Sequence, residues 1–176
     1  MYIKIRQFIL ILCFVMMLCI DTVSARVAPE KNDNNLSKSD KKFIQVASTK
    51  DVNLYLNEKD IYLISQVVCA ESESEPYKGK VAVASVILNR LRDPQFPKTV
   101  QGVIMQKRAF SCIINGNIKK IPDEDSYRAV LEALHGSDPT DKAVFFYNPK
   151  IATSKWMIRF PKKNTHVIGN HVFFTD

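Results

Sequence analysis

Several common functional signals are missing from this sequence of 176 residues. It contains neither a Gly-rich phosphate-binding loop nor a G-x-S-x-G nucleophile elbow, so nothing in it indicates nucleotide binding or serine-hydrolase chemistry. No basic run alternates with aromatic residues, which argues against nucleic-acid binding. His166 and His171 could share one face of a hairpin, but no third metal ligand has suitable spacing, because His135 is distant in the sequence. We therefore predict no metal ion and no cofactor.

Cysteine is also scarce. The chain has four cysteines, and two of them, Cys13 and Cys19, lie in the N-terminal leader described below. The remaining pair, Cys69 and Cys112, does not make a disulfide framework, although an oxidising compartment would permit a bridge between them. We favour two buried free thiols and leave the bridge open.

Residues 1–25 have the pattern of a secretory signal peptide. Lys4 and Arg6 precede an apolar run over 8–20, and V-S-A at 23–25 forms a small-residue cleavage site. A transmembrane helix needs about 20 apolar residues, so this run is short for a membrane span. We predict that the leader is removed and that the protein is exported, with no stable membrane insertion afterwards. An uncleaved N-terminal anchor is the alternative.

The chain is basic, with a formal net charge of +7. A basic exported protein suits an anionic polymer such as a bacterial cell wall, an anionic membrane surface or nucleic acid, and charge alone does not choose among them. Residues 26–56 are polar and of mixed charge, which predicts a tether with little core to bury. Residues 57–176 are long enough for one domain with a hydrophobic core.

Hydrophobic periodicity and capping residues predict helices first and short strands last. The expected helices are 58–72, 77–92, 100–107 and 124–135, and their capping residues include Asn57, Thr99 and Asp123. The expected strands are 143–147, 165–168 and 171–174. Gly169-Asn170 is a two-residue hairpin signal between the last two strands. This order predicts an α+β domain.

Glu71 is the first candidate for a catalytic acid. At 100° per residue, one helix sector of about 120° contains Glu71 together with Ile61, Ile64, Val67 and Val68. A carboxyl on such an apolar face is desolvated, which would raise its pKa and let it protonate a leaving oxygen near neutral pH. The alternative is a helix-end glutamate that reaches solvent or pairs with Arg90.

Other polar and aromatic residues are weaker candidates. Glu73 falls on the opposite helix face and is predicted to be a solvated surface residue. Glu75 could take part in the site, or could cap or support the second helix. Asn89, Tyr147, Asn148 and Trp156 could contact a sugar, because aromatic rings stack on apolar sugar faces and amides bond to hydroxyl and N-acetyl groups. Structural roles, including core packing for the aromatics, are the alternative.

Longer motifs resemble a known family. The chain reads A-E at 70–71, S-E-P-Y at 74–77, G-K-V-A-V-A at 79–84 and V-I-L-N-R at 86–90. The match continues through F-P-K-T-V at 96–100, A-F-S at 109–111, Y-N-P at 147–149, A-T-S-K-W at 152–156 and I-G-N-H-V-F at 168–173. These motifs run in order from about Asp60 to the C-terminus, and they resemble the SleB/CwlJ-type cell wall hydrolases.

This resemblance implies a fold like that of lysozyme and lytic transglycosylases, with helices before a small C-terminal β-hairpin region. It implies cleavage of peptidoglycan between N-acetylmuramic acid and N-acetylglucosamine, as in the spore cortex during germination. The family's catalytic glutamate falls on Glu71, which would protonate the leaving oxygen and then act as base on the muramic 6-hydroxyl, giving a 1,6-anhydro end. Taken with the residue arguments, the expected substrate-binding residues are Glu75, Asn89, Phe110, Ser111, Tyr147, Asn148 and Trp156.

Two positions depart from the family pattern, with Ser74 in place of a glycine and Lys80 in place of a glutamine. Ser74 could cap the helix that follows it. Three alternatives to the transglycosylase stay open. They are a muramidase that hydrolyses the same bond, a non-catalytic wall-binding or spore structural protein, and a basic surface protein that binds anionic lipid or nucleic acid.

Overall fold

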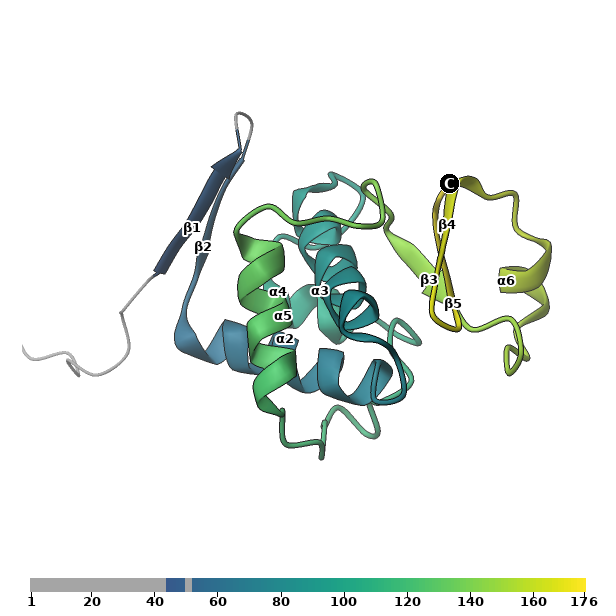
Figure 1. The fold of residues 1–176 in the computed structure, drawn as a ribbon, viewed down its shortest axis with the longest axis horizontal. Helices are drawn as coiled ribbons and strands as arrows, with labels where there is room; N and C mark the ends of the chain where they lie inside the picture. Colours follow the sequence, from purple (N-terminus) through teal and green to yellow (C-terminus); the bar gives the residue numbers. More distant parts are fainter. Residues whose placement is uncertain (1–43, 50–51) are drawn as a thin grey trace, which may run out of the picture. The chain divides into compact units, whose positions relative to one another are not determined.

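The computed structural model describes residues 44–49 and 52–176. Within this part of the chain, helices α2 to α5 precede a three-stranded antiparallel sheet (Figure 1). This order confirms the α+β class predicted from the sequence. The leader predicted for 1–25 and most of the tether predicted for 26–56 lie outside the described residues. No helix of the described part is both long and apolar enough to span a bilayer.

The four predicted helices are present. They are α2 (Glu58–Glu71), α3 (Tyr77–Arg92), α4 (Val100–Ile104) and α5 (Glu124–Leu134). Three of them end within one residue of the predicted bounds. Helix α4 is shorter than the predicted 100–107, because the chain leaves the helix at Met105 and Arg108 has a positive φ of 63°.

Side-chain caps fix where three of the helices begin. The Asn57 side chain accepts from the backbone N–H of Asp60 at 2.9 Å, and the Asp60 carboxylate accepts from the N–H of Asn57 at 3.0 Å. This reciprocal pair is a capping box. Thr99 and Asp123 cap α4 and α5 as predicted. The cap predicted for Ser74 is not formed, because α3 begins after Pro76, which makes no side-chain capping bond.

Helix α3 lies at the centre of the core and is buried from Gly79 to Leu91. Helices α5, α2 and α4 all pack against it. Its polar side chains find partners in other segments: Lys80 lies 3.6 Å from the Asp123 carboxylate, and Ser85 donates to the carbonyl of Ser137 at 3.1 Å. A helix buried on every side must satisfy its polar groups in this way.

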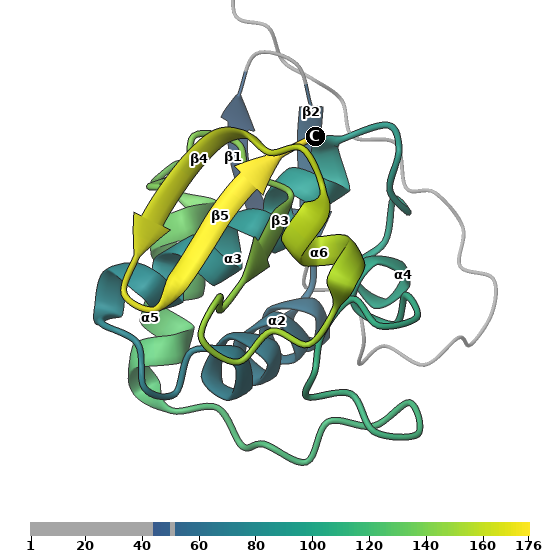
Figure 2. The ribbon, with the colours of Figure 1, turned by 90° about the vertical axis from the view of Figure 1, so that its right-hand side faces the viewer.

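The sheet has the order β3-β5-β4, with β3 at Phe145–Tyr147, β4 at Lys163–Ile168 and β5 at His171–Thr175. Figure 2 shows this sheet in front of the helices, with α6 beside it. The predicted hairpin is present, since Ile168 pairs with His171 across the Gly169-Asn170 turn. Gly169 has φ +60°, a conformation that glycine adopts without steric cost.

Three elements were not predicted. Strands β1 (Ile44–Thr49) and β2 (Val52–Leu56) pair antiparallel inside the segment predicted as a tether. Polar residues in the first part of 26–56 dominate the composition of this segment. The overall composition therefore did not indicate the two strands at its end. Helix α6 (Lys155–Arg159) is five residues long, too short for hydrophobic periodicity to reveal it.

Replacing Asn57 by Ala should lower the free energy of unfolding by about 1 kcal/mol, because the first turn of α2 loses its capping box. Urea denaturation followed by circular dichroism measures this difference. Asn57→Asp keeps an acceptor at the same place and should stay close to wild type. Equal stability of wild type and Asn57→Ala would contradict the cap.

Candidate active site

Glu71 is the last residue of α2 and is half-buried. Its Oε1 atom accepts two hydrogen bonds, one from the Ser111 hydroxyl at 3.0 Å and one from the backbone N–H of Cys112 at 2.8 Å. Among the described residues, no hydrogen bond to its Oε2 atom is seen. The carboxylate is therefore oriented through one oxygen, while the other can meet a ligand. The predicted alternative partner, Arg90, instead donates from Nε to the carbonyl of Val144 at 2.7 Å.

Phe110 anchors the loop that carries these two donors. Its side chain is buried, with the Arg90 guanidinium 5.1 Å from its ring centre and the ring of Phe146 at 6.3 Å. Burial lowers the pKa of Arg90 to about 10, and three phenylalanine rings lie within cation-π distance of it. Phe110 thus has a core position, not the sugar-contacting one predicted. The exposed Ser111 that follows it reaches Glu71.

Cys112 is a free, half-buried thiol next to the same carboxylate. Burial raises its pKa to about 12, and the charge and hydrogen bonding of Glu71 add to the effect. A thiol with such a pKa stays protonated and is a poor nucleophile. Cys69 is also free, with its Sγ atom 3.6 Å from the carbonyl of Ile121. Both thiols are therefore free, as favoured, but only Cys69 is buried as predicted, because Cys112 is half-buried.

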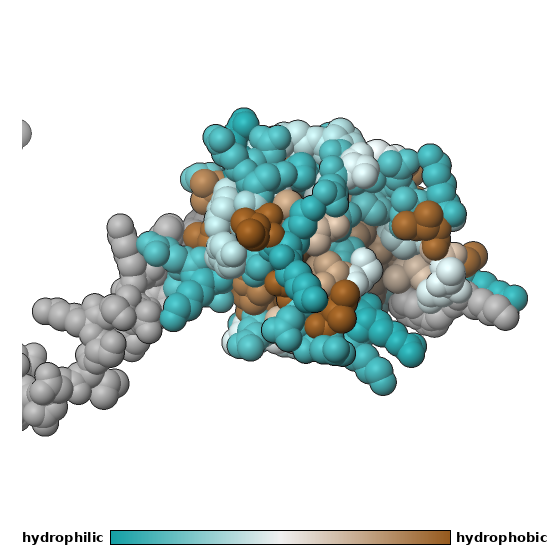
Figure 3. Space-filling view, turned by 90° about the horizontal axis from the view of Figure 1, so that it is seen from below, coloured by the Kyte–Doolittle hydropathy of each residue, from teal (hydrophilic) through white to brown (hydrophobic). Residues whose placement is uncertain are grey.

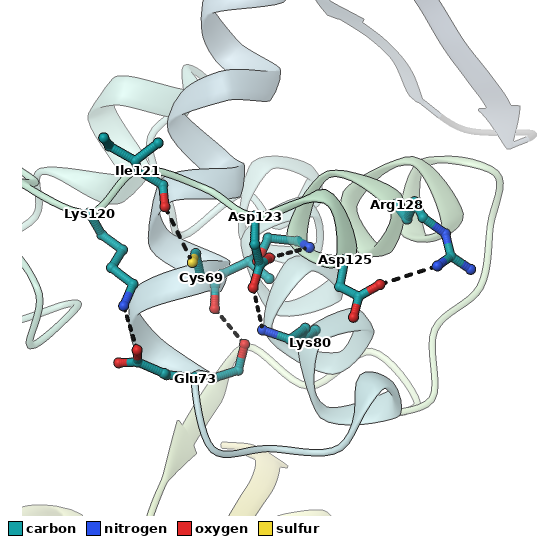
Figure 4. A network of polar contacts seen from close by, with 11 residues as sticks. Cys69, Glu73, Lys80, Lys120, Ile121, Asp123, Asp125 and Arg128 are labelled. Atoms are coloured by element: carbon teal, nitrogen blue, oxygen red, sulfur yellow. Dashed lines mark hydrogen bonds and ion pairs between the residues drawn. The ribbon is translucent and has the colours of Figure 1, made fainter.

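Glu73 is a surface residue, as predicted. Its carboxylate lies 2.6 Å from the Lys120 ammonium (Figure 4). The hydrogen bond from Lys120, followed by the lysine charge, lowers the pKa of Glu73. An exposed carboxylate held in this ion pair is not arranged to act with Glu71.

Glu75 has a position different from the one predicted for a substrate-binding residue. Its side chain is only 5% exposed. Its Oε2 atom accepts from the backbone N–H of Asn170 at 2.8 Å, and its Oε1 atom accepts from the Asn170 side chain at 3.1 Å. Both oxygens are thus engaged by the β4–β5 turn, so Glu75 connects the α2–α3 loop to the sheet.

His171 lies buried beside this contact. Its Nδ1 atom is 3.9 Å from Glu75 Oε1 and has no hydrogen-bond partner within the described part of the chain. Burial lowers the pKa of His171, while the charges of Glu75 and Glu71 act in the opposite direction. The imidazole and the ring of Phe146 form a T-shaped pair, with the ring centres 5.2 Å apart. Among the described residues, no three His, Cys, Asp or Glu side chains gather so that they could hold a metal ion.

Asn89 is likewise buried and structural. It donates to the Asp138 carboxylate at 2.9 Å and to the carbonyl of Ala143 at 3.1 Å, so its amide is not free to bind a sugar as predicted. It lines a cavity of about 630 Å³ with Arg92 and Asp138. Glu71 is not among the residues that line this cavity, which therefore has no connection to the candidate acid.

The remaining predicted residues are in the C-terminal region. Tyr147 is half-buried, with its ring 6.0 Å from that of Phe174 and the Lys162 ammonium 5.2 Å away. The Asn148 side chain accepts from the N–H of Lys150 at 2.9 Å. Trp156 is in α6, but its side chain lies outside the described part. Of the predicted substrate-binding residues whose side chains the structure describes, Ser111 is the one that a hydrogen bond joins to Glu71.

Three residues near Glu71 and Glu75 were not among the predicted site residues. They are Cys112, Asn170 and His171. Cys112 acts through its backbone N–H, which every residue type except proline carries, so its residue type does not mark it. Asn170 acts through both its backbone N–H and its side-chain amide, and the sequence marked it as part of a hairpin turn and a family motif, not as a site residue. The sequence did draw attention to His171, but only as a weak metal ligand.

The surface offers no second obvious site in the view of Figure 3. There, hydrophobic atoms of the described residues form separate patches on a mostly hydrophilic face. Exposed apolar residues also come from several different segments, among them Ile121, Ile151 and Val167. Scattered apolar residues are normal on a soluble surface and do not mark a binding face.

Comparison with known proteins decides the family. A family model described as Cell Wall Hydrolase matches residues 74–174. The chain belongs to the cell wall hydrolase family. This confirms the resemblance seen in the sequence motifs, and Glu71 stands just before the matched range.

Similar proteins agree with this family. The chain is 46% identical over 117 residues to a spore cortex-lytic enzyme of Bacillus cereus, covering 66% of this chain and 44% of that protein. It is 45% identical over 114 residues to a spore cortex-lytic enzyme of Bacillus subtilis, covering 65% and 37%. The chain thus spans less than half the length of these relatives.

Solved structures confirm the lysozyme-like fold. The catalytic domain of the Bacillus cereus SleB protein superposes with a TM-score of 0.63 at 43% identity, covering 73% of this chain and 98% of that one. The catalytic domain of the germination-specific lytic transglycosylase SleB from Bacillus anthracis gives a TM-score of 0.63 at 44% identity, covering 68% and 97%. These two SleB catalytic domains and this chain therefore share one architecture.

Cys112 should react slowly with iodoacetamide at pH 8, because only the thiolate reacts and the pKa of this thiol is about 12. Alkylation of this residue, followed by peptide mass spectrometry, should be at least about 100-fold slower in native protein than in urea. Glu71→Gln should accelerate it, because that change removes a negative charge beside the thiol. Equal rates in native and unfolded protein would contradict the described environment.

Proposed function

We propose that this chain cleaves the glycan backbone of bacterial peptidoglycan as a lytic transglycosylase, with Glu71 as the catalytic acid and base. The observation that carries the proposal is the asymmetric setting of this carboxylate. Oε1 is held by the Ser111 hydroxyl and the Cys112 N–H, which leaves Oε2 for the reacting bond. The proposed substrate is inferred from the family resemblance, which points to the bond between N-acetylmuramic acid and N-acetylglucosamine.

In the first step, protonated Glu71 donates its proton through Oε2 to the glycosidic oxygen, and the bond from the muramic C1 to that oxygen breaks. The carboxylate then accepts the proton of the muramic 6-hydroxyl as O6 bonds to C1. The products are a 1,6-anhydro end and a free hydroxyl on the leaving sugar, and Glu71 is protonated again. Fixed donors on Oε1 preserve the orientation of the carboxyl in both steps.

A two-carboxylate mechanism fits the residues less well. A retaining glycosidase needs a second carboxylate about 5 Å from the first, and an inverting one needs a base across the scissile bond. Of the nearby candidates, Glu73 is exposed and paired with Lys120, and Glu75 is buried against Asn170. Internal attack by the 6-hydroxyl needs no such partner, which favours the transglycosylase over the muramidase.

We also propose where the enzyme works. The basic net charge of +7 suits an anionic wall, and the predicted removal of residues 1–25 would deliver the protein outside the cytoplasm. The relatives named spore cortex-lytic enzymes make cortex peptidoglycan the first substrate to test. In this proposal the tether is limited to the part of 26–56 that precedes β1, because β1 and β2 occupy the end of that segment. Residues 57–176 form the catalytic domain, with no cofactor and no nucleic-acid partner.

Digestion of purified cortex and vegetative sacculi tests the reaction. Wild type should release muropeptides with 1,6-anhydro ends, read by mass spectrometry, and Glu71→Gln should lose about 10²- to 10⁴-fold of the rate. The matched control is Glu73→Gln, which removes an exposed carboxylate from the adjoining loop and should act like wild type.

Three outcomes would change the assignment. Reducing ends in place of anhydro ends would identify a muramidase. Full activity of Glu71→Gln would remove Glu71 as the acid. Binding of sacculi by wild type without any cleavage would favour the wall-binding alternative.

A further inference from the structure

We infer that Glu75 is a positioning residue for Glu71, acting through the C-terminal sheet and the loop that carries Ser111 and Cys112. Glu71 ends α2 and Glu75 lies in the short connection to α3, yet the two glutamates have different surroundings. Glu71 bonds to Ser111, 40 residues later in the sequence, and Glu75 bonds to Asn170, 95 residues later. The inference rests on the proposed role of Glu71.

The first step is the fit of Glu75 against the hairpin turn. A Cβ atom placed on Gly169 would lie 1.9 Å from Glu75 Oε2, far inside any permitted contact. On the other side, a Cβ on Gly79 would lie 2.9 Å from the Glu75 Cβ. The glutamate therefore occupies a slot that exists because both positions are glycine, and its two bonds to Asn170 fix the turn in place.

The second step leads from the turn to the aromatic core. His171 follows Asn170 directly and is buried, with its imidazole in a T-shaped contact with Phe146. Phe146 stacks on Phe173 of the paired strand, with the ring centres 5.6 Å apart. Close-packed aromatic side chains transmit a displacement, because no empty space exists to absorb it. The contact that fixes the position of the turn therefore also fixes the position of the Phe146 ring.

The third step leads from Phe146 back to Glu71. Phe146 contacts Phe110, with the ring centres 6.3 Å apart. Phe110 directly precedes Ser111 and Cys112, the two donors to Glu71 Oε1. The contacts thus form a chain that runs from Glu75 through the sheet to Glu71. The short backbone segment between the two glutamates closes this chain into a ring. A shift of the turn would move the donors away from the carboxylate, and misplacement of a catalytic group by about 1 Å can cost about 100-fold in rate.

Kinetics on a soluble glycan oligomer test the inference. Glu75→Gln keeps the size of the side chain but loses its charge and one acceptor for Asn170. It should lower kcat about 10- to 100-fold with KM within about twofold, because a positioning residue does not touch substrate. Glu73→Gln is the matched control from the same loop and should retain wild-type kcat. A thermal melt of each variant verifies that it is folded.

A double-mutant cycle separates positioning from a general loss of stability. Ser111→Ala removes one donor to Glu71, and combining it with Glu75→Gln should cost less than the product of the two single effects, because both act on one network. Alkylation of Cys112 gives a readout independent of activity, and it should be faster in Glu75→Gln than in wild type.

A third test changes the other side of the contact between Glu75 and the β4–β5 turn. Gly169→Ala, which would press on Glu75, should lower kcat in the same way. Gly136→Ala also places a side chain at positive φ, +101°, and at no lower backbone cost than at Gly169, but its Cβ position is open, so it should leave kcat near wild type. Wild-type kcat in Glu75→Gln, or strictly multiplicative effects with Ser111→Ala, would overturn the inference. An inactive wild type would instead overturn the proposed function.

Discussion

Burial of α3 from Gly79 to Leu91 is the constraint on which the rest of the structure depends. A helix enclosed on all sides cannot leave its polar side chains to water, so each needs a partner in another segment. Lys80 forms an ion pair with Asp123 at the start of α5. Asn89 donates a hydrogen bond to Asp138, which follows the end of α5. Arg90 donates a hydrogen bond to the carbonyl of Val144, next to β3. The polar groups of α3 thereby position the segments that surround it.

The candidate site depends on the segment that leads from α2 into α3. Only a short connection separates the end of α2 from Pro76, and its acidic residues have three different surroundings. Glu71 keeps one oxygen available, Glu73 pairs with Lys120 at the surface, and Glu75 is buried against the β4–β5 turn. In the proposed function, environment and not residue type assigns Glu71 to chemistry and Glu75 to architecture.

The sequence predicted what depends on local signals. Caps and apolar periodicity gave α2, α3 and α5 nearly to the residue, and the G-N turn gave the β4–β5 hairpin. The sequence did not reveal contacts that exist only after folding, such as those of Glu71 with Cys112 and of Glu75 with Asn170. It also assigned Phe110 and Asn89 to substrate because a motif marks a position as special without saying whether packing or binding is the reason.

The central claim is that Glu71 delivers its proton through the oxygen that Ser111 and Cys112 leave available. A crystal structure of the Glu71→Gln variant with a peptidoglycan fragment bound across the site tests this claim most directly. The account predicts a glycosidic oxygen about 3 Å from the side chain at position 71, on the side away from Ser111. A fragment bound only in the cavity beside Asn89 and Asp138, with no sugar near position 71, would contradict it.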